Sequence, residues 1–132
     1  MRTIKFRAQD FTKTWNYGYV AMGNESAVLF PKMKDGSVMI DIQIYVLPET
    51  VGQYTGLKDK NGTEIYEGDI ISFVDGLKKV NGEWIDNEHI YSVEYSEAAF
   101  NGVCGLSKCL DDVEVIGNIY DNPELLNKKL SV

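Results

Sequence analysis

The chain of 132 residues is long enough for one domain or for two small subdomains that share a core, and its 44% hydrophobic residues are typical of a globular protein. Its net charge of −7 disfavours non-specific binding to nucleic acid, because an acidic protein repels the phosphate backbone. No apolar run approaches the roughly 18 residues needed to cross a membrane, and residues 1–7 lack the apolar core of a signal peptide, so we expect a cytoplasmic protein without membrane contact.

Charge is distributed unevenly along the sequence. Residues 1–13 hold four basic side chains against one acid, Asp10, whereas residues 83–124 hold ten acids against one base, Lys108. Two explanations stay open. These segments are ordinary solvated faces, or they are oppositely charged ends that attract one another between neighbouring copies in a homo-oligomer.

In the first third of the chain, alternation of apolar and polar residues predicts β-strands with one buried face. In residues 3–9, Ile4, Phe6 and Ala8 alternate with polar residues, and in residues 38–46 three isoleucines do the same. Pro48 ends the second run, and the residues up to position 52 then favour a single helical turn. The change of pattern near residues 48–52 is the predicted boundary between two subdomains.

Five Asx-Gly pairs separate the apolar runs. Asn and Asp tolerate positive φ and Gly adopts it freely, so each pair favours a tight primed turn between antiparallel strands. The pairs are Asp35-Gly36, Asn61-Gly62, Asp75-Gly76, Asn81-Gly82 and Asn101-Gly102. Turns at such short spacing predict a mainly β protein. Asn61-Gly62, which two apolar runs flank, is the clearest hairpin signal.

Further strands are predicted over residues 70–74, 91–95 and 113–120, where large apolar side chains alternate or run together. A short terminal helix is expected from Pro123 to Leu130, with Asn122 as its N-cap. We expect this helix to pack on the sheet. A fraying tail, or a helix that docks on a partner, is the alternative.

Residue types that carry catalysis are few. The chain has neither the phosphate-binding P-loop motif nor the Gly-x-Ser-x-Gly motif of hydrolases. The single histidine, His89, fits a surface or edge strand better than an acid–base role. Cys104 and Cys109 are five apart and lack the partners of a closed zinc site, so we expect two free thiols and no cofactor.

Two carboxylate pairs are candidate ligands for a divalent metal. Glu67 and Asp69 are two residues apart, as are Asp112 and Glu114, so each pair would share one face of a strand. Such a site would serve a metal-dependent phosphodiesterase or nuclease, but the Glu-x-Lys pattern common in these enzymes is absent from the sequence. Residues 67–69 also favour a turn in which Asp69 accepts hydrogen bonds from backbone amides. We therefore expect no catalytic or metal-binding residues.

Aromatic side chains in the acidic part of the chain form the candidate interaction surface, which comprises Tyr54, Tyr66, Trp84 and Tyr91. Aromatic residues that line a small β-barrel can bind an extended peptide or a single nucleic-acid strand. Nucleic-acid platforms carry basic residues and this part is acidic, so an extended peptide or a basic protein fits better. Ordinary core packing is the alternative explanation for these rings.

Five segments follow a common pattern in order along nearly the whole chain: Ile4–Ala8, Thr50–Asp59, Glu67–Ile71, Val115–Tyr120 and Asn122–Leu126. Together they resemble the YopX family, whose members are encoded by bacteriophages and by prophages of Gram-positive bacteria. Gln9 departs from the pattern, in which an aromatic residue precedes the aspartate, and residues 76–110 match no part of it. The resemblance implies two subdomains, the second a small SH3-like β-barrel, and is in keeping with a homo-oligomer. It brings no catalytic residues.

We therefore predict a mainly β fold (α+β overall), with a β-rich subdomain over residues 1–50, an SH3-like barrel over 51–121 and a C-terminal helix or tail over 122–132. The expected function is that of a phage or prophage accessory protein in the cytoplasm of a bacterial host. It would be a non-enzymatic module that binds a host or phage protein. The alternatives are a divalent-metal-dependent phosphodiesterase or nuclease, and nucleic-acid binding through the basic N-terminal strand with Lys5 and Arg7.

Overall fold

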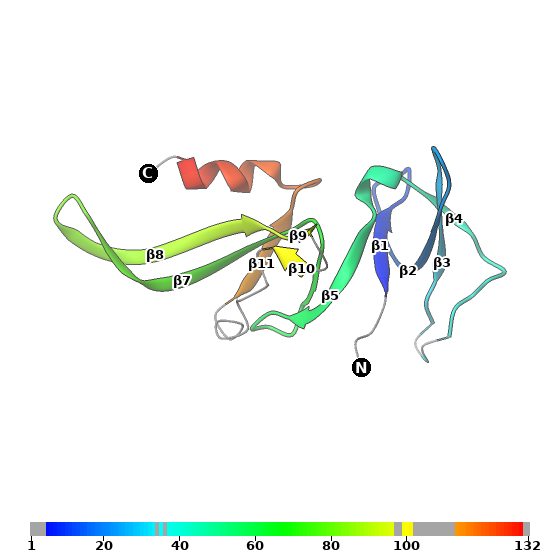
Figure 1. Cartoon of the computed structure of the whole chain (residues 1–132), viewed down its shortest axis with the longest axis horizontal. Helices are drawn as coiled ribbons and strands as arrows, with labels where there is room; N and C mark the ends of the chain where they lie inside the picture. Colours follow the sequence, from blue (N-terminus) through cyan, green and yellow to red (C-terminus); the bar gives the residue numbers. More distant parts are fainter. Residues whose placement is uncertain (1–4, 34, 36, 97–98, 102–112, 131–132) are drawn as a thin grey trace. The chain divides into compact units, whose positions relative to one another are not determined.

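The structure, a computed structural model, describes residues 5–33, 35, 37–96, 99–101 and 113–130 (Figure 1). The chain divides into two compact units, Met1–Gly56 and Leu57–Val132. Both are built mainly from antiparallel strands, which confirms the predicted mainly β class. The finer division at residues 50 and 121 stays a prediction. No helix among the described residues is long and apolar enough to span a membrane.

The first unit is a twisted antiparallel sheet with the strand order β4-β3-β2-β1-β5. Its elements are β1 (Phe6–Gln9), β2 (Trp15–Met22), β3 (Ala27–Pro31), β4 (Ile44–Val46), the 3-10 helix η1 (Pro48–Thr50) and β5 (Gly52–Lys58). The short helix η1 lies where a single helical turn is predicted. β5 runs on past Gly56 into the second unit and pairs there with β6 (Glu64–Tyr66).

Hydrogen bonds bring the end of β4 back to the end of β1 in the first unit. Asp10 forms an isolated antiparallel bridge with Val46, and the Leu47 N–H donates to the carbonyl of Gln9 at 2.7 Å. The Gln9 N–H in turn donates to the Thr50 hydroxyl oxygen at 2.9 Å. The folded-back sheet buries a small core of Ala8, Ala27, Leu29 and Val46. Burying these side chains is the main force that holds the sheet in this curved form.

Gly18 in β2 allows this curvature, because the backbone of β3 passes directly over it. A Cβ atom at this position would collide with the carbonyl oxygen of Phe30. Any other residue would therefore force β2 and β3 apart.

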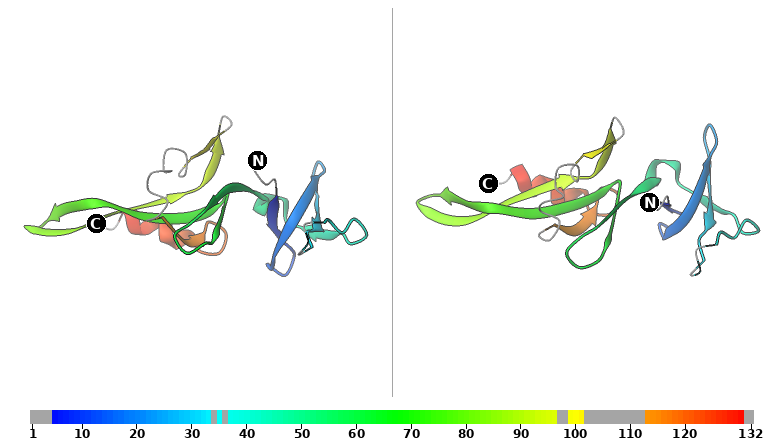
Figure 2. Two further views of the ribbon diagram at one scale, coloured as in Figure 1. Left: turned by 90° about the horizontal axis from the view of Figure 1, so that it is seen from below. Right: turned by 60° about the horizontal axis from the view of Figure 1, so that its bottom comes forward.

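The second unit contains a three-stranded sheet in the order β11-β7-β8 and a separate β9-β10 hairpin. Its remaining elements are β7 (Asp69–Val80), β8 (Glu83–Ser92), β9 (Glu94–Ser96), β10 (Ala99–Asn101), β11 (Glu114–Asn118) and the 3-10 helix η2 (Pro123–Leu130). Figure 2 shows β7 and β8 as one long two-stranded ribbon. Helix η2 lies beside β8 (Figure 1).

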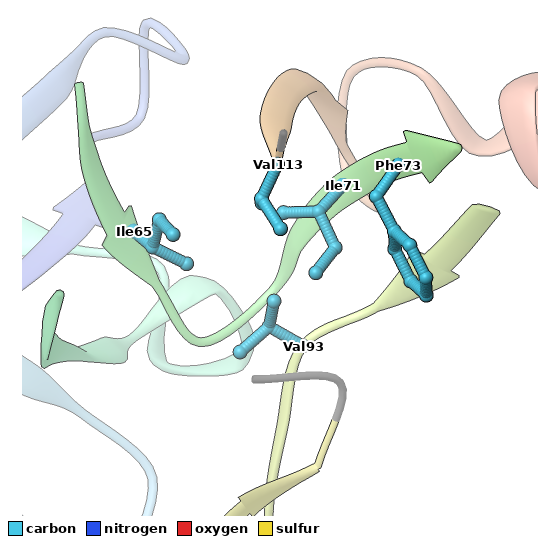
Figure 3. Close-up of a cluster of buried hydrophobic side chains, with 5 residues drawn as sticks. All are labelled: Ile65, Ile71, Phe73, Val93 and Val113. Atoms are coloured by element: carbon cyan, nitrogen blue, oxygen red, sulfur yellow. The ribbon is translucent and has the colours of Figure 1, made fainter. Parts of the chain in front are cut away.

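The core of the second unit gathers apolar side chains from segments that are distant in the sequence (Figure 3). It comprises Ile65, Ile71, Phe73, Val93 and Val113. Val93 lies between the end of β8 and the start of β9; its N–H donates to the carbonyl of Asp69 and its own carbonyl accepts from the N–H of Gly68. The single strand predicted over residues 91–95 is therefore divided at Val93, whose side chain is part of the core.

The buried carboxylate of Asp59 organises the turn between β5 and β6. One oxygen accepts hydrogen bonds from the N–H groups of Asn61 (2.8 Å) and Thr63 (2.9 Å). The other oxygen accepts from the N–H of Val115 in β11 at 2.9 Å. One side chain thus closes a local turn and attaches that turn to a strand 56 residues further along the chain.

The Asx-Gly pairs take three different conformations. Asn81 and Gly82 both have positive φ, 52° and 84°, as the predicted primed turn between β7 and β8 requires. At Asn61-Gly62 only the glycine has positive φ, because the Asp59 carboxylate and carbonyl already hold a turn of the non-primed kind. Gly76 lies inside β7, where residues 75–76 form a bulge rather than the predicted turn. The other two pairs include glycines outside the described residues.

Two predicted elements need correction in their extent or type. Of the strand predicted over residues 38–46, only Ile44–Val46 is a strand, and Ile40 and Ile42 are exposed, so their alternation with polar residues reflects no buried face. The terminal helix is a 3-10 helix over the predicted residues. The Asn122 side chain accepts from the N–H of Asn118 (3.3 Å) on its N-terminal side and thus bonds back towards β11.

The expected SH3-like barrel over residues 51–121 is not found as a closed barrel. In the described part of the second unit, the strands pair into an open three-stranded sheet and a two-stranded hairpin. A bulge between Val115 and Gly117 and another between Val74 and Leu77 bend this sheet without closing it.

We predict that Asp59→Ala lowers the free energy of unfolding by roughly 1–3 kcal/mol, because it removes the acceptor of three partly buried backbone N–H groups and with it the connection between the turn and β11. Asp35→Ala is the matched control, since the exposed Asp35 carboxylate accepts from the N–H and hydroxyl of Ser37 in its own turn. The control should cost no more than about 0.5 kcal/mol. Urea unfolding of the three proteins measures the difference, and equal losses in both variants would contradict the role of Asp59.

Candidate functional site

The four aromatic residues of the predicted interaction surface do not form one surface. Tyr54 is buried in the first unit, where the Lys5 ammonium lies 5.3 Å from its ring centre. Tyr66 is buried in the second unit, and its hydroxyl donates to a carboxylate oxygen of Glu64 at 3.0 Å. Tyr91 is half-buried, and Trp84 is 66% exposed near the tip of the β7–β8 hairpin. Of the four, Trp84 is the one best placed to touch a partner.

Trp84 belongs to an exposed apolar row on one face of the hairpin. The register pairs Val74 with Glu88, Leu77 with Asp86 and Lys79 with Trp84, and side chains of paired residues project to the same side of a sheet. The bulge at residues 75–76 keeps Val74 and Leu77 on that common side. We call these residues the hairpin face: Val74, Leu77, Lys79, Trp84, Asp86 and Glu88. All six are exposed.

A second and more aromatic surface lies on the outer side of the first unit. Tyr17, Tyr19 and Tyr45 are 46%, 43% and 62% exposed. The register pairs Tyr19 with Phe30 and Val28 with Tyr45, so these rings lie on the side of the sheet opposite the core. We call these residues the aromatic band: Trp15, Tyr17, Tyr19, Phe30 and Tyr45.

The aromatic band was not anticipated from the sequence, although a local signal exists. Trp15, Tyr17 and Tyr19 alternate with smaller residues, which is the period-two pattern of a strand with a distinct face. The contributions of Phe30 and Tyr45 depend on how β2, β3 and β4 pair. That pairing is not readable from local pattern.

Basic side chains share the face of the aromatic band. Arg7 pairs with Tyr17, and its guanidinium stacks on the Trp15 ring at 4.3 Å, which leaves the residue only 6% exposed. Lys32 follows β3, and its N–H donates to the carbonyl of Tyr17. Among the described strand residues that alternation places on this face, none is an acid.

The two units differ strongly in charge. Residues 1–56 hold six Lys and Arg against five Asp and Glu, a balance of +1. Residues 57–132 hold seven against fifteen, a balance of −8. The acidity of the whole chain therefore belongs to the second unit, where Asp86 and Glu88 contribute to the hairpin face.

The candidate metal-binding carboxylates have structural roles where the structure describes them. Asp69 is buried, and one of its oxygens accepts from the N–H of Tyr66 at 2.7 Å, which confirms the predicted turn. Glu114 forms an ion pair with Lys60 at 3.0 Å. Glu67 lies half-buried in the turn before β7, and Asp112 lies outside the described residues. Within the described ranges, no group of three or more His, Cys, Asp or Glu side chains could hold a metal ion.

His89 lies in β8 within a stack of rings. Its imidazole is 5.1 Å from the Phe73 ring and 6.0 Å from the Tyr91 ring, measured between centres. Its two nitrogens lie 3.3 Å from the Asn87 amide nitrogen and 3.4 Å from the Tyr91 hydroxyl. These contacts give the histidine a packing role on the sheet. Cys104 and Cys109 lie outside the described residues, so the free-thiol expectation stays a prediction.

Three aspartates in turns have lowered pKa values. Hydrogen bonds from the Thr12 hydroxyl, and then from neighbouring backbone and Asn16 groups, lower the pKa of Asp10 to about 2. Burial acts to raise the pKa of Asp59, but backbone N–H groups of Val115, Thr63 and Asn61 outweigh it and the net direction is downward. The Ser37 hydroxyl and N–H lower the pKa of Asp35.

Comparison with known proteins identifies a family and solved structures that are similar to this chain. Residues 1–127 match the family model described as YopX protein. The chain is similar to the crystal structure of protein EF1440 from Enterococcus faecalis, with 28% sequence identity and a TM-score of 0.60. The alignment covers 96% of this chain and 99% of that chain. No curated protein matches the sequence.

The three lowered pKa values predict a loss of stability in acid. Because the folded state favours the ionised carboxylates, their contribution is complete above the ordinary pKa of 3.8 and is lost as the pH falls through the lowered pKa of each group, which for Asp10 is about 2. The melting temperature should therefore be nearly constant from pH 7 to pH 5 and fall steeply below pH 4. Asp59→Asn should melt below the wild type at pH 7, and this gap should narrow in acid. A gap that stays constant down to pH 2.5 would contradict the assignment.

Proposed function

Because the chain belongs to the YopX family, we propose that it is a phage or prophage accessory protein that acts as a non-enzymatic protein-interaction module in the cytoplasm of the bacterial host. The name of the similar Enterococcus faecalis protein states no activity, so the surface of the molecule has to support the proposal. Its partner is a host or phage protein.

The aromatic band is the observation that carries the proposal. Tyrosine, tryptophan and arginine are the residues that most often dominate binding energy at protein interfaces, because they bury much area with little loss of conformational entropy. The band presents three exposed tyrosines on a hydrogen-bonded sheet, and the stack of Arg7 on Trp15 fixes one end of it. An exposed aromatic face of this kind fits another protein surface better than a small molecule, which binds in a concave pocket.

Both alternatives have less support. A metal-dependent nuclease would use Glu67 and Asp69 or Asp112 and Glu114, yet Asp69 is buried and accepts a backbone hydrogen bond, and Glu114 is paired with Lys60. Nucleic-acid binding through the N-terminal strand would need Arg7 to reach phosphates, yet its guanidinium lies against Trp15 within the first unit. Lys5 and Lys32 on the same face are the features that keep binding of single-stranded nucleic acid as the second candidate.

The test is affinity capture with the tagged full-length chain from bacteria undergoing prophage induction, followed by reconstitution with the purified partner. Tyr17→Ser/Tyr19→Ser should weaken the reconstituted complex at least tenfold, since each lost hot-spot residue costs about 2 kcal/mol. Met22→Ser is the matched control, because Met22 is exposed on the same strand outside the band. It should bind like the wild type.

Two results would contradict the proposal. One is a partner whose affinity is the same for the band variant and the control. The other is recovery of the chain alone, together with salt-sensitive binding of a single-stranded oligonucleotide that the band variant loses.

A further inference from the structure

The aromatic band and the hairpin face have opposite electrostatic character. The band lies on a face whose charged strand residues are bases, in a unit with a balance of +1. The hairpin face carries the acids Asp86 and Glu88 against one base, Lys79, and belongs to a unit with a balance of −8. Surfaces of opposite charge attract during encounter and fix orientation on contact. The chain therefore carries both halves of a charge-complementary pair.

The apolar parts of the two faces also match in character. Leu77 and Trp84 are largely exposed at the outer half of the hairpin, with Val74 beside them. On the band, the exposed rings of Tyr17 and Tyr19 offer an aromatic surface. Contact between the two would remove apolar area from water on both sides, which is the main driving force for association. Lys32 beside Tyr17 would then face the acidic residues of the hairpin.

We infer that the protein partner of the aromatic band is the hairpin face of a second copy of this chain, so that copies associate head to tail. The inference rests on the proposed function, since it names the occupant of the same binding surface. Each copy uses its band for one neighbour and its hairpin face for another. A heterologous contact of this kind builds a closed ring when the rotation closes and a filament when it does not.

Charge also disfavours the symmetric alternatives. A two-fold contact between two hairpin faces would bring together two net acidic surfaces, since each carries Asp86 and Glu88 against the single base Lys79. A two-fold contact between two bands would bring together two faces that each carry the base Lys32. The contact between unlike faces instead places a net acidic surface against a basic one.

Two variants of the full chain test the inference. The band variant is Tyr17→Ser/Tyr19→Ser and the hairpin variant is Leu77→Ser/Trp84→Ser; all four residues are exposed, so both should keep the far-ultraviolet circular dichroism and melting temperature of the wild type. Sedimentation velocity over a range of concentrations should show an oligomer for the wild type and the Met22→Ser control. Each variant alone should be monomeric, with a dissociation constant at least tenfold higher. Wild-type association should weaken as salt rises.

A mixture of the two variants distinguishes this arrangement from any symmetric one. The band variant keeps an intact hairpin face and the hairpin variant keeps an intact band, so the mixture should form a 1:1 complex that grows no further. A monomeric wild type would overturn the inference, as would self-association of either variant or a mixture that stays monomeric. If the wild type is monomeric but a host or phage protein binds the band, the proposed function stands and only the second copy is excluded.

Discussion

The second unit depends on a buried carboxylate that joins two distant segments of the chain. Asp59 accepts from N–H groups of its own turn with one oxygen and from β11 with the other. The next residue adds to this connection, since the Lys60 N–H donates to the carbonyl of Val113 and its ammonium pairs with Glu114. Val113 is thereby held in the core beside Ile71, and β11 is held in register with β7. A local turn signal thus has a long-range consequence for packing.

The sequence allowed prediction wherever one residue type meets a local conformational demand. Asn81-Gly82 supplies two consecutive positive φ values, and Asp69 accepts from a nearby amide, and both were predictable for that reason. Prediction failed where partners distant in the sequence decide the outcome. The isoleucines at positions 40 and 42 alternate like strand residues, yet no neighbouring element covers them. The turn expected at Asp75-Gly76 became a bulge because β8 continues to pair on both sides of it.

The candidate surface was only partly predictable for the same physical reason. Tyr54 and Tyr66 are aromatic and lie among polar neighbours in sequence, but the fold buries both. Trp84 stays exposed because the hairpin extends past the core that Phe73 and Ile71 help to form. The aromatic band forms only when β2, β3 and β4 pair. The difference in net charge between the first and the second unit becomes visible only when the boundary between them is known. A surface that several strands build together depends on the register in which they pair, and local sequence pattern does not specify that register.

The bulge at residues 75–76 also separates two packing environments along one ribbon. On its inner side, Ile71 and Phe73 are held by the core, so exchange of either residue would be felt by the whole unit. On its outer side, Leu77 and Trp84 face solvent and are free to vary without a folding penalty. Substitutions at the tip of the hairpin could therefore change which partner binds there while the fold of the unit stays the same.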